Sequence, residues 1–152
     1  MRVSMGLATV VLVGMLVWGG AAPEESSSRM TLSFTELIGY GMINAYSTNV
    51  LVRKGLAGKC LTEEDAFENV ERNLAFAKVL QRYALSLKRS STNEDEEMKK
   101  LIARICEAAT YLERQTASLK DWLNEPESKS ARMLFEDYSE KVEKKIELML
   151  AK

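Results

Sequence analysis

The sequence predicts an all-α protein, an antiparallel up-down-up-down four-helix bundle preceded by an N-terminal signal segment. Helix breakers are scarce after residue 32, where the only proline is Pro126 and the glycines are confined to positions 39, 41, 55 and 58. Four stretches of similar length carry apolar residues at three- and four-residue spacing, which places them on one side of a helix. Short polar turns separate these stretches, and such turns join antiparallel neighbours in bundles.

Residues 1–21 have the three parts of a secretory signal peptide. Arg2 and the N-terminal amine form a positive start, an uncharged and mostly apolar run follows, and small residues lead up to a cleavage site that we expect after Ala21. The alternative is an uncleaved membrane anchor through residues 3–23. This segment contains four glycines and barely reaches the ~20 apolar residues that a spanning helix needs.

Export would place the mature chain in the periplasm or the secreted space, and we expect membrane association only if the N-terminal segment is retained. Residues 22–32 are polar and serine-rich, and we expect them to form a flexible lead-in. Residues 33–152 then form one helical bundle domain of ordinary size. The formal net charge of −1 argues against a nucleic-acid partner, which requires a basic face.

The first predicted helix runs from about Phe34 to Ala57. Ser33 can cap its N-terminus, and Glu36, three residues later, completes the pattern of a capping box. Gly58 suits the left-handed position that often follows a helix.

The second predicted helix runs from about Glu63 to Arg89. Thr62 is its expected N-cap, with Asp65 three residues later. Its apolar stripe departs once from regular helical spacing. The stripe consists of Phe67, Val70, Leu74, Ala77, Leu80, Ala84 and Leu87.

The third helix is expected to start after Thr92, because the acidic run Glu94–Glu97 is favourable at the positive, N-terminal end of a helix dipole. We expect it to end near Asn124. The fourth is expected to begin around Pro126, a residue tolerated in a first turn, and to run to about Leu150. Their stripes are Met98, Leu101, Ile105, Ala108, Leu112, Leu119 and Trp122 in the third, and Ala131, Phe135, Tyr138, Val142, Ile146 and Met149 in the fourth.

The chain contains no histidine, which limits the chemistry available to it. This excludes Ser-His-Asp and Cys-His catalytic arrangements and the Glu-x-x-His pairs of di-iron bundles. A zinc site would have to rely on two cysteines and carboxylates. We therefore expect no catalytic residues, no metal site and no cofactor.

The only cysteines are Cys60 and Cys106, and we expect no disulfide between them. In an antiparallel helix pair that turns near Ser91, their positions are mismatched by about 16 residues, roughly 24 Å at 1.5 Å per residue. A disulfide requires Cα atoms within about 7 Å of each other.

The first helix is unusual because no charged residue lies between Glu36 and Arg53. A helix that is neutral around its whole circumference is normally buried on most sides. Its polar residues Tyr40, Asn44 and Ser47 share one side, with Thr48 adjacent. These four residues are the candidate interface, for a second copy of the chain or for an envelope protein. A central bundle helix with locally bonded polar groups, or a small-molecule pocket, are the alternatives.

These observations favour an exported, non-catalytic helical protein, in coiled-coil-like packing, that mediates protein–protein contact in the cell envelope or the secreted space. The alternative function is a ligand or metal carrier that uses the interior of the bundle.

Overall fold

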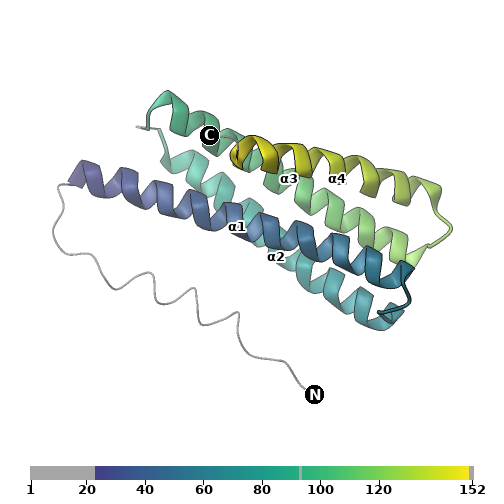
Figure 1. The fold of residues 1–152 in the computed structure, drawn as a ribbon. Helices are drawn as coiled ribbons and strands as arrows, with labels where there is room; N and C mark the ends of the chain where they lie inside the picture. The colour runs from purple at the N-terminus through teal and green to yellow at the C-terminus, as the bar shows by residue number, and fades with distance from the viewer. Residues whose placement is uncertain (1–22, 93, 151–152) are drawn as a thin grey trace, which may run out of the picture.

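The computed structural model describes residues 23–92 and 94–150, and within these ranges it contains four helices packed against each other and no strand (Figure 1). The helices are α1 (Pro23–Ala57), α2 (Glu63–Ser90), α3 (Glu96–Asn124) and α4 (Lys129–Leu150). Consecutive helices run in opposite directions along a common axis (Figure 1). The all-α, four-helix part of the prediction is confirmed, whereas the predicted signal segment, residues 1–21, lies outside the described ranges.

Helix α3 is the central element of the bundle, because it packs against α1, α2 and α4. Helix α1 lies against α2 and α3 and makes a lighter contact with α4. None of the four described helices is both long enough and apolar enough to cross a membrane.

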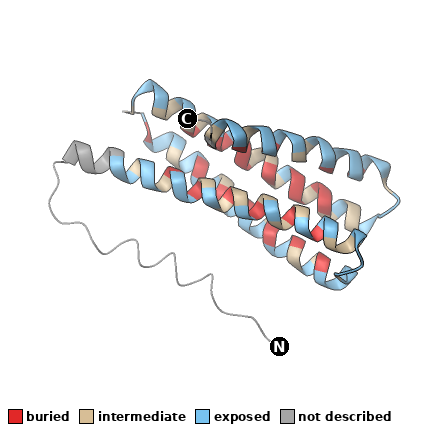
Figure 2. Cartoon of the chain, in the orientation of Figure 1, coloured by how far each residue is buried: buried red, intermediate tan, exposed pale blue. Residues whose placement is uncertain are grey.

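The core follows the predicted apolar stripes and is widest on α3, in keeping with its three neighbours (Figure 2). Ile102, Ile105, Leu112 and Leu119 of α3 are at most 1 % exposed. The other helices contribute a narrower line of buried apolar residues, which are Ile38, Met42, Ala45 and Val52 from α1, Ala66, Val70, Ala77, Leu80 and Ala84 from α2, and Ala131, Phe135, Val142 and Ile146 from α4.

The predicted starts of the second and third helices have different outcomes. Thr62 caps α2 as expected, since its hydroxyl oxygen accepts a hydrogen bond from the backbone N–H of Asp65 at 3.1 Å. Thr92 was expected just before the third helix, but the cap is Asp95, whose Oδ1 accepts from the N–H of Met98 at 2.7 Å. The reason is that Ser91 still belongs to the end of α2, so the chain needs the next few residues to reverse direction.

Helix α1 begins well before the predicted start at Phe34, so residues 23–32 are helical rather than a flexible lead-in and Ser33 is an interior residue instead of a cap. No glycine or proline interrupts the chain between Pro23 and Gly39, and Pro23 is compatible with a first turn. Helix α4 begins at Lys129, slightly later than predicted from Pro126. Ser128 provides its start, because its hydroxyl oxygen accepts from the N–H of Ala131 at 3.4 Å.

The turn after α1 also differs in detail from the prediction. The left-handed residue is Lys59, with a φ of 54°, and not Gly58. The N–H of Gly58 still donates to the carbonyl of Lys54 at 2.9 Å, so the helical hydrogen bonding extends one residue further than the sequence indicated. The N–H of Cys60 then donates to the carbonyl of Gly55 at 2.8 Å and closes the turn.

Candidate interaction surface

A buried asparagine fixes α1 against α3. The side chain of Asn49 is fully buried, and its Nδ2 donates to Gln115 Oε1 and to Thr116 Oγ1, both at 2.8 Å. The Thr116 hydroxyl in turn donates a hydrogen bond to the backbone carbonyl of Leu112 at 2.8 Å. These bonds are directional, so they select one rotation of α1 about its axis as well as one axial register.

The same hydrogen-bond network reaches the remaining two helices. Asn73 of α2 donates from its Nδ2 to Asn49 Oδ1 at 2.6 Å and to the carbonyl of Ala45 at 2.8 Å. Gln115 donates from its Nε2 to Ser139 Oγ of α4 at 2.9 Å. We call this set, Asn49, Asn73, Gln115, Thr116 and Ser139, the polar layer. Every buried side-chain nitrogen or oxygen among the described residues has a hydrogen-bond partner, so the layer is satisfied without a ligand.

Because Asn49 points inward, the opposite side of α1 points to solvent. Tyr40, Asn44 and Ser47 are exposed, as a shared side predicts, and Thr48 is half-buried at its edge. The Thr48 hydroxyl donates to the carbonyl of Asn44 at 2.9 Å. The structure thus brings the four candidate interface residues together on one side of one helix.

Two leucines extend this side of α1 and give it an apolar character. Leu37 and Leu51 are more than half exposed, as is Tyr40. We call the six residues Leu37, Tyr40, Asn44, Ser47, Thr48 and Leu51 the neutral face. No charged side chain interrupts it, since α1 carries none between Glu36 and Arg53.

Helix α2 continues the apolar surface beside the neutral face. A Cβ built on Gly41 would lie 2.8 Å from Leu80 Cδ2 and 3.4 Å from Phe76 Cζ, so the missing side chain is what lets α2 approach α1 closely here. Phe76 is partly exposed, and Val79 and Tyr83, which follow it by three and seven residues, are exposed on the same side of α2.

Charged groups flank the neutral face at both ends. Glu36 precedes it, and Arg53 and Lys54 follow it. Arg53 is engaged within the fold, since its guanidinium lies 3.5 Å from Glu136 Oε1 and 5.9 Å from the centre of the Phe135 ring. Glu36 and Lys54 are exposed, and neither forms an ion pair with another residue in the described part of the chain.

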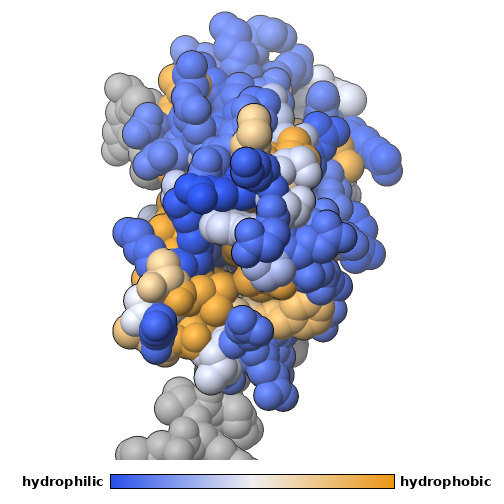
Figure 3. All heavy atoms as spheres, turned by 90° about the vertical axis from the view of Figure 1, so that its right-hand side faces the viewer, coloured by the Kyte–Doolittle hydropathy of each residue, from blue (hydrophilic) through white to orange (hydrophobic). Residues whose placement is uncertain are grey.

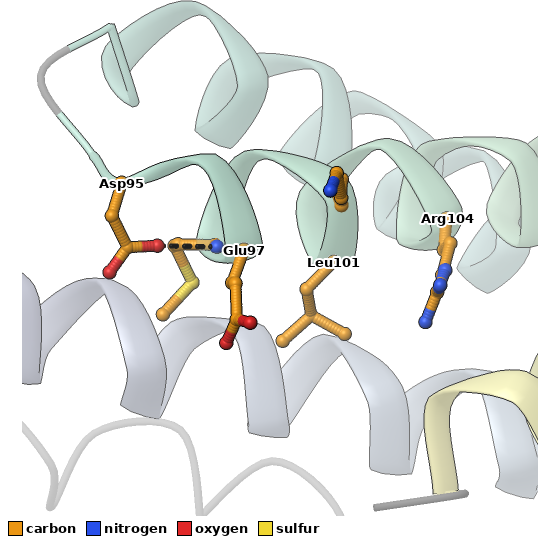
Figure 4. A pocket seen from close by; sticks show the side chains of 6 residues that line it. Asp95, Glu97, Leu101 and Arg104 are labelled. Atoms are coloured by element: carbon orange, nitrogen blue, oxygen red, sulfur yellow. Dashed lines mark hydrogen bonds between the residues drawn. The ribbon is translucent and has the colours of Figure 1, made fainter.

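The end of the bundle that lies on the right-hand side of Figure 1 is predominantly hydrophilic, with hydrophobic side chains gathered in the lower part of the view in Figure 3. A shallow open hollow lies at the other end, near the start of α3, with Glu97, Leu101 and Arg104 projecting from one side of that helix (Figure 4). Arg104 also donates to the carbonyl of Leu148 near the end of α4, at 3.2 Å. Because all its lining residues come from the start of α3 and its N-cap Asp95, and their charges have both signs, this hollow is not a defined binding site.

Within residues 23–92 and 94–150, no group of three or more His, Cys, Asp or Glu residues is placed to hold a metal ion. Cys60 is exposed in the turn before α2, and Cys106 is buried, with its Sγ 3.2 Å from the carbonyl oxygen of Ala84. Burial raises the pKa of the Cys106 thiol, and the nearby Lys88 ammonium partly opposes that effect.

The polar layer is the functional feature that sequence reasoning missed. Its signals were present, because Asn73 lies three residues after Val70 and four before Ala77, where the predicted stripe of the second helix departs from regular spacing. Asn49 likewise lies four residues after Ala45 and three before Val52. A polar residue at a core position of a helix indicates a buried hydrogen-bond partner on another helix.

Comparison with protein-family models, with curated proteins and with solved structures gives no significant match to this chain.

Proposed function

We propose that this chain is an exported, non-catalytic helical protein that makes protein–protein contact in the cell envelope or the secreted space through the neutral face of α1. The observation that carries the proposal is the exposure of Leu37, Tyr40 and Leu51 on a side of the helix that has no charge. Exposed helix surfaces normally carry charged side chains in every turn or two, as α2, α3 and α4 do here. Contiguous apolar patches on soluble proteins typically mark an interaction site.

The support for the proposal also comes from the way the surface is held. The polar layer fixes the rotation of α1 from behind, through the bonds of Asn49 to Gln115 and Thr116. A binding surface on a rigid helix loses little conformational entropy when a partner binds. The neutral face therefore has the two properties of a preorganised contact surface, which are apolar area and a fixed orientation.

The alternative function, a carrier that uses the interior of the bundle, has less support. A carrier requires a cavity with unpaired polar groups or metal ligands directed into it. The described interior instead holds the polar layer and close-packed side chains, and its buried polar atoms bond to each other.

Site-specific photo-crosslinking in the organism that makes the protein tests the proposed contact. A photoreactive phenylalanine analogue at Tyr40 should give covalent adducts that mass spectrometry identifies as a protein, including a second copy of the chain. Met133 of α4 is the matched control, because it is 68 % exposed, as is Tyr40, but lies outside the neutral face. Equal adduct yields at the two positions, or none at Tyr40, would contradict the proposal.

The exported location has its own test, because it rests on the sequence of residues 1–21. Intact-mass analysis of protein isolated from its native host should show a chain that begins at about Ala22 and is recovered outside the cytoplasm. Full-length chain in the membrane fraction would favour the anchor through residues 3–23, and full-length chain in the cytoplasm would refute export.

A further inference from the structure

We infer that the partner of the neutral face is a second copy of this chain, bound with its α1 antiparallel and related by a two-fold axis at the level of Ala45. This inference rests on the proposed contact function and specifies its partner. Three features of the described surface lead to it. They are the placement of the unpaired charges Glu36 and Lys54, the distribution of apolar groups, and the absence of charge between Glu36 and Arg53.

The first feature is the spacing of Glu36 and Lys54. Glu36 lies nine residues before Ala45 and Lys54 nine residues after it. Lys54 follows Glu36 by eighteen positions, which is about five turns, so both side chains project from the same side of α1. In an antiparallel pair centred at Ala45, each Glu36 therefore lies opposite the second copy's Lys54, and the contact gains an ion pair at each end.

The second feature is that apolar groups match in the same register. Tyr40 lies five residues before Ala45 and Leu51 six residues after it, about three turns apart and thus on one side of the helix. The two-fold axis places Tyr40 of each copy within one residue, about 1.5 Å along the helix, of the second copy's Leu51. Asn44 lies next to the axis and therefore faces Asn44 of the second copy. An asparagine amide can both donate a hydrogen bond to an identical amide and accept one from it.

The third feature is neutrality. In a two-fold contact every residue close to the axis meets its own type, so a charged residue there would face a like charge. The neutral face has no such residue between Glu36 and Arg53. A parallel arrangement of the two α1 helices would instead place Glu36 against Glu36 and Lys54 against Lys54, so the charge pattern favours the antiparallel one.

The available area is sufficient for a reversible dimer. The apolar side chains of this surface are between 37 and 68 % exposed, and they are Leu37, Tyr40 and Leu51 of α1 with Phe76, Val79 and Tyr83 of α2. At about 200 Å² for each fully exposed side chain, they present about 600 Å² per copy. Two copies would bury about 1,200 Å², the lower end of the standard range for specific interfaces, and we expect a dissociation constant on the order of micromolar.

Sedimentation velocity over a wide range of concentrations measures this dimer. The sample is the protein purified from its host, with the N-terminus that it has in that host. The wild type should shift from monomer to twice the monomer mass as concentration rises. Tyr40→Lys should raise the dissociation constant more than about tenfold, because it places a charge in an apolar contact twice. Met133→Lys, the matched control, should leave the dissociation constant unchanged, and circular dichroism should show unaltered helix content in both variants.

A charge-reversal cycle tests the antiparallel register specifically. Glu36→Lys or Lys54→Glu alone should raise the dissociation constant by about threefold to tenfold, since each creates two like-charge contacts. The double variant restores opposite charges across the interface and should return the dissociation constant to within about twofold of the wild type. If the double variant instead showed the sum of the two single effects on the dissociation constant, the antiparallel register would be wrong.

The remaining outcomes separate this inference from the proposed function. A wild type that stays monomeric at all concentrations, together with adducts from Tyr40 to a different protein, overturns the dimer and leaves the contact function standing. A monomeric wild type with no adducts overturns both. A dimer that is insensitive to Tyr40→Lys forms through another surface and also overturns the inference.

Discussion

Asn49 of α1 and Gln115 of α3 are joined by a hydrogen bond of 2.8 Å between two fully buried amides, in the interior of a bundle whose core is otherwise largely apolar. The bond ties together two helices that are not consecutive in the chain. Apolar packing alone tolerates small rotations and shifts between helices, whereas an amide that loses its partner in the core is costly. The pair therefore determines which side of α1 faces solvent.

Removal of this amide should destabilise the fold strongly. In Asn49→Ala, Gln115 Oε1 loses its donor and Asn73 Nδ2 loses one of its two acceptors, so we expect the free energy of unfolding to fall by about 2–4 kcal/mol. Urea denaturation followed by circular dichroism measures the change. Asn124→Ala, at an exposed position at the end of α3, is the control and should change the value by less than about 0.5 kcal/mol. A loss below about 1 kcal/mol for Asn49→Ala would show that water replaces the lost bonds.

Gly39 and Gly41 of α1 should respond differently to substitution by alanine. A Cβ on Gly39 would meet no atom within 4 Å, so Gly39→Ala should raise the free energy of unfolding by about 0.5–1 kcal/mol through helix propensity. A Cβ on Gly41 would lie 2.8 Å from Leu80 Cδ2, and Leu80 is a buried side chain that must shift to make room. Gly41→Ala should therefore gain less than Gly39→Ala, or lose stability. Equal gains in urea titrations would contradict the close approach of α1 and α2 at Gly41.

The turn between α1 and α2 contains a strained residue whose replacement should be favourable. Lys59 has a φ of 54°, a conformation that glycine adopts without the steric penalty of a Cβ. Lys59→Gly should raise the free energy of unfolding by about 0.5–1 kcal/mol, as measured by thermal and urea denaturation. Lys59→Ala separates the backbone effect from loss of the lysine charge, because alanine keeps the Cβ and should give no gain.

The two thiols should differ sharply in reactivity. Cys60 is exposed and Cys106 is buried beside the carbonyl of Ala84, so a thiol reagent such as Ellman's should label one cysteine in the native protein and the second only after unfolding. From Glu63 to Ala84 the chain rises roughly 30 Å along α2, which separates the two sulfurs far beyond bonding distance. A Cys60–Cys106 peptide in a non-reducing digest of the monomer would contradict this register.

Alkaline pH should destabilise the bundle through the buried Cys106 and the half-buried Tyr46. Burial raises the pKa of the Cys106 thiol above its ordinary 9.0, and burial, followed by the carboxylates of Glu143 and Glu147, raises the pKa of Tyr46 above 10.0. Both groups bind their proton more tightly in the folded chain, so their contribution is complete below the unfolded pKa values and is lost as pH rises through the folded ones. Urea midpoints should therefore fall above about pH 9, and Cys106→Ala should reduce the fall.

The helices could be predicted from the sequence because their signals are local. Periodicity placed Val70, Leu112 and Phe135 correctly in the core, since each repeats at helical spacing within its own segment. The boundary errors are also local, because Ser33 and Thr92 have good capping chemistry but lie where the chain has no need of a cap.

Sequence spacing alone does not identify partners on different helices, so the bonds of Asn49 to Asn73 and Gln115 became visible only in three dimensions. For the same reason, the sequence identified Tyr40, Asn44 and Ser47 as one side of a helix but could not show Phe76 and Tyr83 beside them.

The central position of α3 sets the order in which the bundle comes apart. Its buried side chains contact the other three helices, so the amides around Leu112 can exchange their hydrogens with solvent only when the whole fold opens. Helix α1 makes the least contact with the rest of the bundle and can detach without disturbing the packing of α2 and α4 on α3. Hydrogen exchange should accordingly be slowest in α3 and faster in α1. The pair α3–α4, which shares the most extensive helix contact, is the unit that persists longest as the protein unfolds.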